Sequence, residues 1–252
     1  MKPMKIQSLF TVSLFLLLTN RTSVLTRPCF QYTPEAQIMP VGSVPPVADA
    51  VQFTYIPDYP IHFIGDSRTV GMKQALAYYQ YDLTDHIFTA RIGKGYSWLA
   101  GQKELTTIPP SILVLNLGVN DLGNLNRYQA LYEEYASGCW KDCPIYIVSV
   151  NPCCCPCTSV SNRQIEAFNT SMQQWIEEYN NENSAKTAAA FPIRYIDTYS
   201  YLVSEGYASA DGLHYSAATY QTIYNHILDE IQEPVGDGNG TYVYSDPEES
   251  SD

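Results

Sequence analysis

Short apolar runs alternate with amphipathic segments through the middle of this 252-residue chain. The apolar runs have the length of strands and cover Ile61–Ile64, His86–Ile92, Ile112–Leu117, Pro144–Val150 and Ile193–Ile196. Between them, apolar residues recur at helical spacing, which predicts helices over Val70–Tyr79, Tyr96–Glu104, Asn126–Ser137, Arg163–Tyr179 and from about Ser216 onward. The run Ile112–Leu117 is almost wholly apolar, as is typical of a central strand buried on both faces. Because short strands alternate with helices, we expect βαβ units and an α/β fold with a mainly parallel sheet.

Both ends of the chain depart from this pattern. Residues 1–27 place basic residues ahead of the apolar run Leu9–Leu18, which is too short to cross a bilayer comfortably and is typical of a secretory signal. No Ala-x-Ala cleavage site follows, so an uncleaved membrane anchor remains the alternative. The proline-containing residues 28–57 predict an extended linker, and residues 233–252 predict an acidic disordered tail. We therefore expect one domain over 58–232, in a protein that is secreted or extracellular, or anchored to a membrane by its N-terminus.

The charge balance narrows the class of partner. The chain carries 26 acidic and 14 basic residues, a formal net charge of −12. Nucleic acids and anionic membranes repel such a surface, so we expect neither as a ligand. The expected partner is neutral or carries a localised negative charge.

Seven cysteines are a second unusual feature, and four of them lie between Cys153 and Cys157. In an exported protein such cysteines are mostly oxidised, so disulfides are our first interpretation. A zinc site and free or redox-active thiols are the alternatives. The cluster follows the strand that ends at Val150, so we expect it to stiffen one wall of a site at that edge of the sheet. Connectivity, and the fate of the odd cysteine, do not follow from the sequence.

Three short motifs follow predicted strands and carry reactive side chains. Ser67 comes after the first strand, Asn120 after the central one, and Asp211 and His214 after the last. Ligands of open α/β sheets bind outside the carboxyl ends of the strands, so we expect these side chains to converge. A serine becomes an effective nucleophile only when a base accepts its proton. Of the four histidines, only His214 combines a loop position with an aspartate three residues earlier that can orient its ring.

Each motif taken alone has a commoner structural explanation. A serine at such a position often caps a helix, and Gly118–Asp121 and Asp211–Gly212 are typical of turns. Their joint occurrence in one order favours catalysis. The motifs Gly65–Ser67, Gly118–Asp121 and Asp211–His214 together resemble the blocks of the SGNH hydrolases, also called GDSL-like esterases and lipases, over roughly residues 58 to 232.

This resemblance implies a flavodoxin-like, three-layer α/β/α sandwich. It implies that Ser67, His214 and Asp211 are the catalytic residues. The oxyanion hole would then consist of the side-chain amide of Asn120 and the main-chain N–H groups of Gly95 and Ser67. No cofactor and no metal ion is implied.

Several positions near the motifs have more than one interpretation. The glycine block of the family fits Gly95, which precedes a predicted helix, and Gly93 is the alternative. Arg68 stands where the family label has leucine; a structural ion pair is our first interpretation, and binding of an anionic substrate group is the alternative. We expect Asp66 and Asp121 to brace loops.

Together these inferences predict an exported serine esterase that hydrolyses short acyl esters, acetyl above all, on a carbohydrate or cell-wall polymer through an acyl-enzyme intermediate. A lipase, lysophospholipase or thioesterase of the same family is the nearest alternative, and a non-catalytic carbohydrate-binding module is the alternative from another class. The expected partner is an acylated small molecule or carbohydrate, with membrane contact only through an uncleaved anchor. The acyl chain, the alcohol and the oligomeric state do not follow from these residues.

Overall fold

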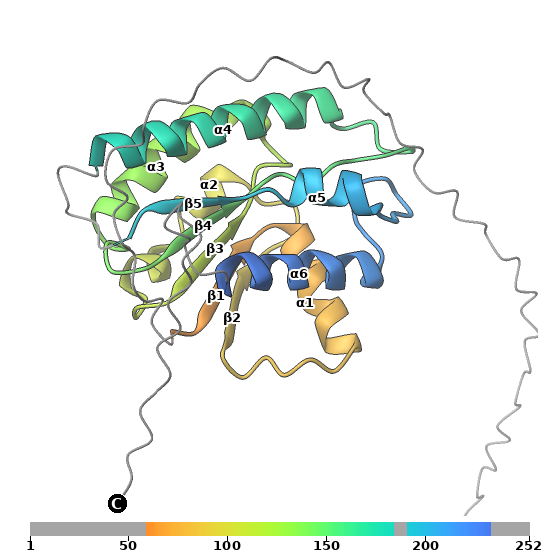
Figure 1. The fold of residues 1–252 in the computed structure, drawn as a ribbon, viewed down its shortest axis with the longest axis horizontal. Coiled ribbons are helices and arrows are strands. Elements are labelled where there is room, and N and C mark those ends of the chain that lie inside the picture. Colours follow the sequence, from red (N-terminus) through yellow and green to blue (C-terminus); the bar gives the residue numbers. More distant parts are fainter. Residues whose placement is uncertain (1–58, 184–190, 233–252) are drawn as a thin grey trace, which may run out of the picture.

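A five-stranded parallel sheet forms the centre of the protein (Figure 1). The computed structural model describes residues 59–183 and 191–232. The strands are β1 (Ile61–Gly65), β2 (His86–Ala90), β3 (Ile112–Asn116), β4 (Ile145–Val148) and β5 (Ile193–Ile196). Their order, β2-β1-β3-β4-β5, is flavodoxin-like. The predicted leader (1–27), linker (28–57) and tail (233–252) lie outside the described residues.

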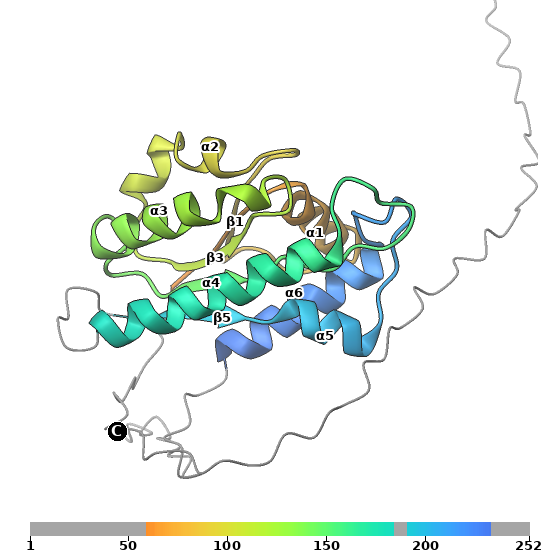
Figure 2. The ribbon, with the colours of Figure 1, turned by 90° about the horizontal axis from the view of Figure 1, so that it is seen from above.

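Helices cover both faces of this sheet (Figure 2). One face packs against α1 (Ser67–Tyr78), α5 (Thr198–Glu205) and α6 (Ala217–Gln232). The other packs against α2 (Tyr96–Leu99), α3 (Leu125–Ser137) and α4 (Asn162–Asn183). The predicted three-layer sandwich is therefore confirmed. Within the described parts of the chain, no helix is long and apolar enough to cross a membrane.

The central strand explains why its sequence is apolar throughout. Ile112 and Val114 belong to the core cluster under α1 and α6, whereas Leu113 and Leu115 belong to the cluster under α3 and α4. Successive side chains of a strand point to opposite faces, so a strand covered on both sides needs apolar residues at every position. This burial fixes the register of β3 and carries the segment after Asn116 to the edge where β1 also ends.

Two helices differ from the prediction. The helix expected over Tyr96–Glu104 ends at Leu99, and a separate 3₁₀ helix covers Lys103–Thr107. Between them Gly101 N donates to Trp98 O, three residues earlier, instead of to the carbonyl four residues earlier as in an α-helix. Helix α5 was not predicted, although Asp197 supplies an N-cap signal by accepting a hydrogen bond from the N–H three residues later.

Candidate active site

Ser67 is placed by the junction of β1 and α1. It is the first residue of α1, and the preceding Asp66 caps this helix by accepting a hydrogen bond from Arg68 N at 2.9 Å. The strand before it is buried, so the turn is held firmly against the sheet. Although Ser67 is only 7% exposed, its Oγ lies 2.9 Å from Nε2 of His214. The structure thus brings together two residues that are 147 positions apart.

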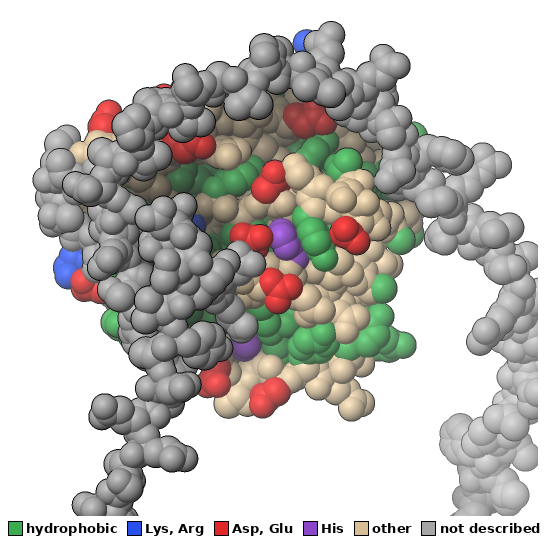
Figure 3. All heavy atoms as spheres, viewed as in Figure 1, with side chains coloured by type: hydrophobic (Ala, Val, Ile, Leu, Met, Phe, Trp, Pro, Cys, Tyr) green, Lys and Arg blue, Asp and Glu red, His purple; other side chains and the backbone are tan. Residues whose placement is uncertain are grey.

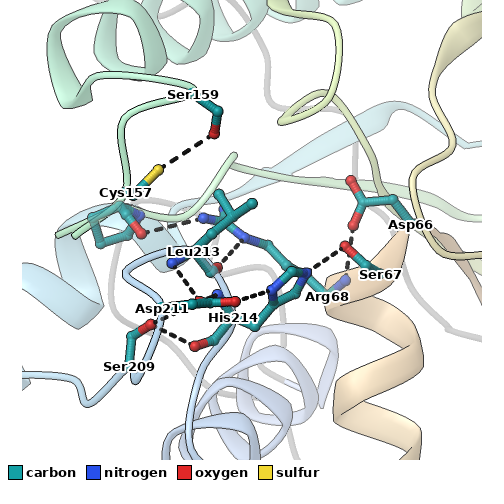
Figure 4. Close-up of polar contacts among 10 residues, drawn as sticks. Asp66, Ser67, Arg68, Cys157, Ser159, Ser209, Asp211, Leu213 and His214 are labelled. Atoms are coloured by element: carbon teal, nitrogen blue, oxygen red, sulfur yellow. Dashed lines mark hydrogen bonds and ion pairs between the residues drawn. The ribbon is translucent and has the colours of Figure 1, made fainter. Parts of the chain in front are cut away.

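Asp211 orients the ring of His214 (Figure 4). Its Oδ2 lies 2.7 Å from Nδ1 of His214, and its Oδ1 accepts main-chain hydrogen bonds from Leu213 and His214. Partial burial alone would raise the pKa of Asp211, but these hydrogen bonds outweigh it and hold the pKa well below the usual range. An ionised Asp211 favours a proton on Nδ1 and leaves Nε2 to accept the Ser67 proton.

The other three histidines have structural contacts away from this pair. Nε2 of His62 lies 2.8 Å from Thr89 Oγ1, and Nε2 of His86 lies 2.9 Å from the Tyr224 hydroxyl. The ring of His226 stacks on an aromatic neighbour. The arrangement agrees with the choice of His214 as the candidate base.

The side-chain amide of Asn120 contacts Asp66, the residue before Ser67. Its Nδ2 donates to Lys94 O at 2.8 Å and to Asp66 Oδ2 at 3.2 Å. The amide has two hydrogens, so both have acceptors in this structure. To bind an oxyanion, Asn120 would exchange one of these acceptors for the substrate oxygen. Its place in the oxyanion hole remains a prediction.

Comparison with known proteins assigns the chain to a family. The family model described as GDSL-like lipase/acylhydrolase matches residues 61–227, which is more than half of the chain. The chain belongs to this family. No curated protein matches it in sequence.

Solved structures of other proteins are similar to this chain at low sequence identity. A Streptococcus pneumoniae protein described as a platelet activating factor has 20% identity and a TM-score of 0.50, covering 71% of this chain and 86% of that one. A lipase/acylhydrolase from Enterococcus faecalis has 16% identity and a TM-score of 0.49, covering 71% and 99%. An acetyl xylan esterase has 15% identity and a TM-score of 0.46, covering 68% and 98%. At 20% identity, the first of these likenesses concerns the fold alone.

The two glycine candidates of this GDSL-family chain differ in their surroundings. A Cβ atom built on Gly95 would lie 2.3 Å from Asp121 Oδ2, whereas one built on Gly93 would meet nothing within 4 Å. Gly93 instead has a left-handed φ of +67°. Position 95 therefore requires glycine because Asp121 lies so close to it, and position 93 favours glycine because of its left-handed φ.

The two aspartates of the motifs brace loops, as expected. Asp66 holds Arg68 N and Asn120, as described above, and burial raises its pKa to about 6. Asp121 accepts hydrogen bonds from Tyr96 N at 2.8 Å and from the Tyr128 hydroxyl at 2.7 Å. These contacts tie the loop of Gly95 to the loop of Asn120.

Neither interpretation of Arg68 agrees with the structure. The side chain is 2% exposed, so it is not open to a substrate anion, and none of the ion pairs among the described residues includes it. Its guanidinium instead donates to three main-chain carbonyls. Arginine carries five N–H donors in a planar fork, which suits it to such a cluster of acceptors.

The predicted disulfides are absent from the part of the chain that the structure describes. Cys143 and Cys153 are buried in the core, where a thiol packs as a small apolar side chain. Cys29 lies outside the described residues. The expected position of the cluster agrees with the structure, because Cys154 N donates to Gly212 O at 2.9 Å in the histidine loop.

A groove of about 490 Å³ opens beside Ser67 and His214. One face of α1 forms its floor, and Ile92 and the start of α6 contribute its walls; the lining residues are Ser67, Val70, Gly71, Gln74, Ala75, Tyr78, Ile92, His214, Tyr215, Ala217 and Tyr220. His214 is the single titratable lining residue apart from the tyrosines. On the described part of the face in Figure 3, acidic side chains are more prominent than basic ones. This groove was not predicted from the sequence.

Proposed function

We propose that this chain is a serine esterase that acts on uncharged acyl esters. The observation that carries the proposal is the hydrogen-bonded series from Ser67 Oγ through both ring nitrogens of His214 to Asp211 Oδ2, with distances of 2.9 and 2.7 Å. Such an arrangement of nucleophile, base and orienting carboxylate is the recurring geometry of acyl transfer. It lies at the mouth of a groove that can hold a substrate.

In this mechanism His214 Nε2 takes the Ser67 proton while Oγ attacks the acyl carbon. The carbonyl oxygen becomes negative and accepts hydrogen bonds from the Asn120 amide and from the N–H groups of Gly95 and Ser67. The tetrahedral intermediate expels the alcohol, which takes the proton from His214 and leaves the acyl group on Ser67. Water then attacks this ester with His214 again as base, and the carboxylic acid is released.

Our leading substrate is a short acyl ester, acetyl above all, of a carbohydrate or cell-wall polymer. The openness of the groove next to Ser67 supports access by a bulky alcohol, and the absence of Asp, Glu, Lys and Arg from its lining residues supports a neutral substrate. The leader-like residues 1–27 support export, so the enzyme would act outside the cytoplasm.

The groove also supports a second candidate, hydrolysis of longer acyl chains by a lipase, lysophospholipase or thioesterase. Its floor follows α1 from Ser67 to Tyr78, a length of about 16 Å at the rise of an α-helix. Val70, Ala75 and Ile92 give it an apolar lining. An extended chain of several methylenes would bury its surface there.

The test is hydrolysis of p-nitrophenyl acetate, butyrate and octanoate by the purified protein, beside Ser67→Ala and the remote control Ser137→Ala. We expect the parent protein and Ser137→Ala to hydrolyse these esters, and Ser67→Ala to lose the activity. A preference for acetate supports the polymer deacetylase, and a preference for octanoate supports the second candidate. If Ser67→Ala retains the activity, or if no ester is turned over, the catalytic proposal fails and the carbohydrate-binding module takes its place.

A further inference from the structure

Arg68 follows Ser67 directly and contacts two distant segments of the chain. Its Nε donates to Leu213 O at 3.1 Å. Its Nη1 donates to Asn151 O at 2.7 Å, and its Nη2 donates to Pro152 O at 3.3 Å. One side chain therefore connects the start of α1 to the segment after β4 and to the histidine loop, as Figure 4 shows for the last of these.

These contacts lie on both sides of His214. Leu213 precedes the histidine and gives its carbonyl to Arg68, while Tyr215 follows it and places its ring 5.1 Å from Arg68 Cζ. The Tyr215 hydroxyl donates to Pro152 O, the same carbonyl that Arg68 reaches. The main chain that carries the imidazole is thus held on either flank by one guanidinium.

The opposite side of the same loop is fixed as well. Gly212 has a left-handed φ of +79°, and its carbonyl accepts the hydrogen bond from Cys154 N. A Cβ at Gly212 would lie 1.9 Å from Cys154 O, so the two segments are in close contact. The histidine loop is therefore held on one side by the Gly212–Cys154 contact and on the other by Arg68.

Other side chains cannot replace this arrangement. A leucine at 68 would remove the donor to Leu213 O and Asn151 O and leave Pro152 O with the Tyr215 hydroxyl alone, and a lysine presents one compact charge that cannot span the three carbonyls. Arg68 does not line the groove, which separates it from any direct contact with substrate.

We propose that Arg68 is a positioning residue that sets His214 at hydrogen-bond distance from Ser67. It acts through the main chain of Leu213 and the ring of Tyr215. The inference rests on the proposed serine esterase activity. A shift of about 1 Å in a catalytic group costs on the order of 10²-fold in rate.

The experiment compares Arg68→Leu and Arg68→Lys with the parent protein in kcat and KM for p-nitrophenyl acetate, below the unfolding temperature of each. We expect kcat to fall by about 10- to 100-fold in Arg68→Leu and by less in Arg68→Lys, with KM within about twofold, because the groove is untouched. The matched control is Arg194→Leu. Arg194 also lies over a tyrosine ring, with Cζ 5.7 Å from that of Tyr146, but on β5. We expect its kcat to be unchanged.

A second readout follows His214 without relying on turnover. The measurement is an NMR spectrum of protein with isotope-labelled histidine, in which the ring signals of His214 are assigned through His214→Gln. These signals should shift and broaden in Arg68→Leu and stay fixed in Arg194→Leu. Unchanged kcat and unchanged ring signals in a folded Arg68 variant would overturn the proposal. If Arg68→Leu does not fold, Arg68→Lys decides by the same criteria. If the parent protein hydrolyses no ester, the proposed function fails and the ring signals alone decide the role of Arg68.

Discussion

Replacing Asn120 by alanine tests the oxyanion hole quantitatively. Removal of one such donor typically raises the barrier by about 2.7–4 kcal/mol. Here the amide already binds Lys94 O and Asp66 Oδ2, and it must release one of them when the oxyanion forms. That exchange costs about 1 kcal/mol, the net worth of a hydrogen bond. The expected effect is therefore about 2–3 kcal/mol, or a fall of about 30- to 150-fold in kcat.

The assay measures kcat and KM of Asn120→Ala with p-nitrophenyl acetate. KM should change little, because the donor acts mainly on the transition state. Asn124→Ala is the matched control, since its Nδ2 also donates to a carboxylate, Asp121 Oδ2 at 2.9 Å, without contacting Asp66. We expect the control to keep kcat within about threefold. If Asn120→Ala keeps more than half of the parent kcat, its role as an oxyanion donor is refuted.

Two further predictions concern stability. Gly212→Ala places Cβ against Cys154 O and should destabilise the protein by about 3 kcal/mol or more in urea unfolding. Gly206→Ala also has a positive φ, +85°, but open space, so it should cost less, about 1–3 kcal/mol from backbone strain alone. Equal losses in the two variants would show that crowding is unimportant. Burial raises the pKa of Asp66 from 3.8 to about 6, so its stabilising contribution is fully present below pH 3.8 and is lost as the pH rises through about 6. Relative to Asp66→Asn, the parent should lose on the order of 3 kcal/mol of unfolding free energy between pH 4 and pH 7, and parallel pH profiles for the two would contradict this.

The fold was largely predictable because burial leaves a simple pattern. β3 is covered on both faces, so its apolar run identified a central strand without ambiguity. The edge strand β2 is only partly buried, and its prediction extended two residues beyond Ala90. Helix α5 was missed because it has only eight residues, too few to establish a helical period against the signal of the preceding strand.

The candidate site was predictable where spacing in the chain carries the geometry. Asp211 and His214 are three residues apart, so a single turn brings their side chains together. The partners of Arg68 were not predictable, since main-chain carbonyls have no signature in the sequence and lie more than 80 residues away. The burial of Cys153 was not predictable for the same reason, because spacing along the chain does not indicate which side chains of a loop pack in the core.

Three parts of helix α1 have different roles. Its first residue is Ser67, its inner face packs Met72 and Leu76 into the core, and its outer face forms the floor of the groove. The core contacts fix the helix, so a change on the outer face need not disturb the serine. Substitutions at Val70 or Gln74 can therefore alter which acyl groups or alcohols fit while the Ser67–His214 distance stays the same. Under the proposed function, selectivity depends on the groove, and catalytic competence depends on the loops that Arg68 holds together.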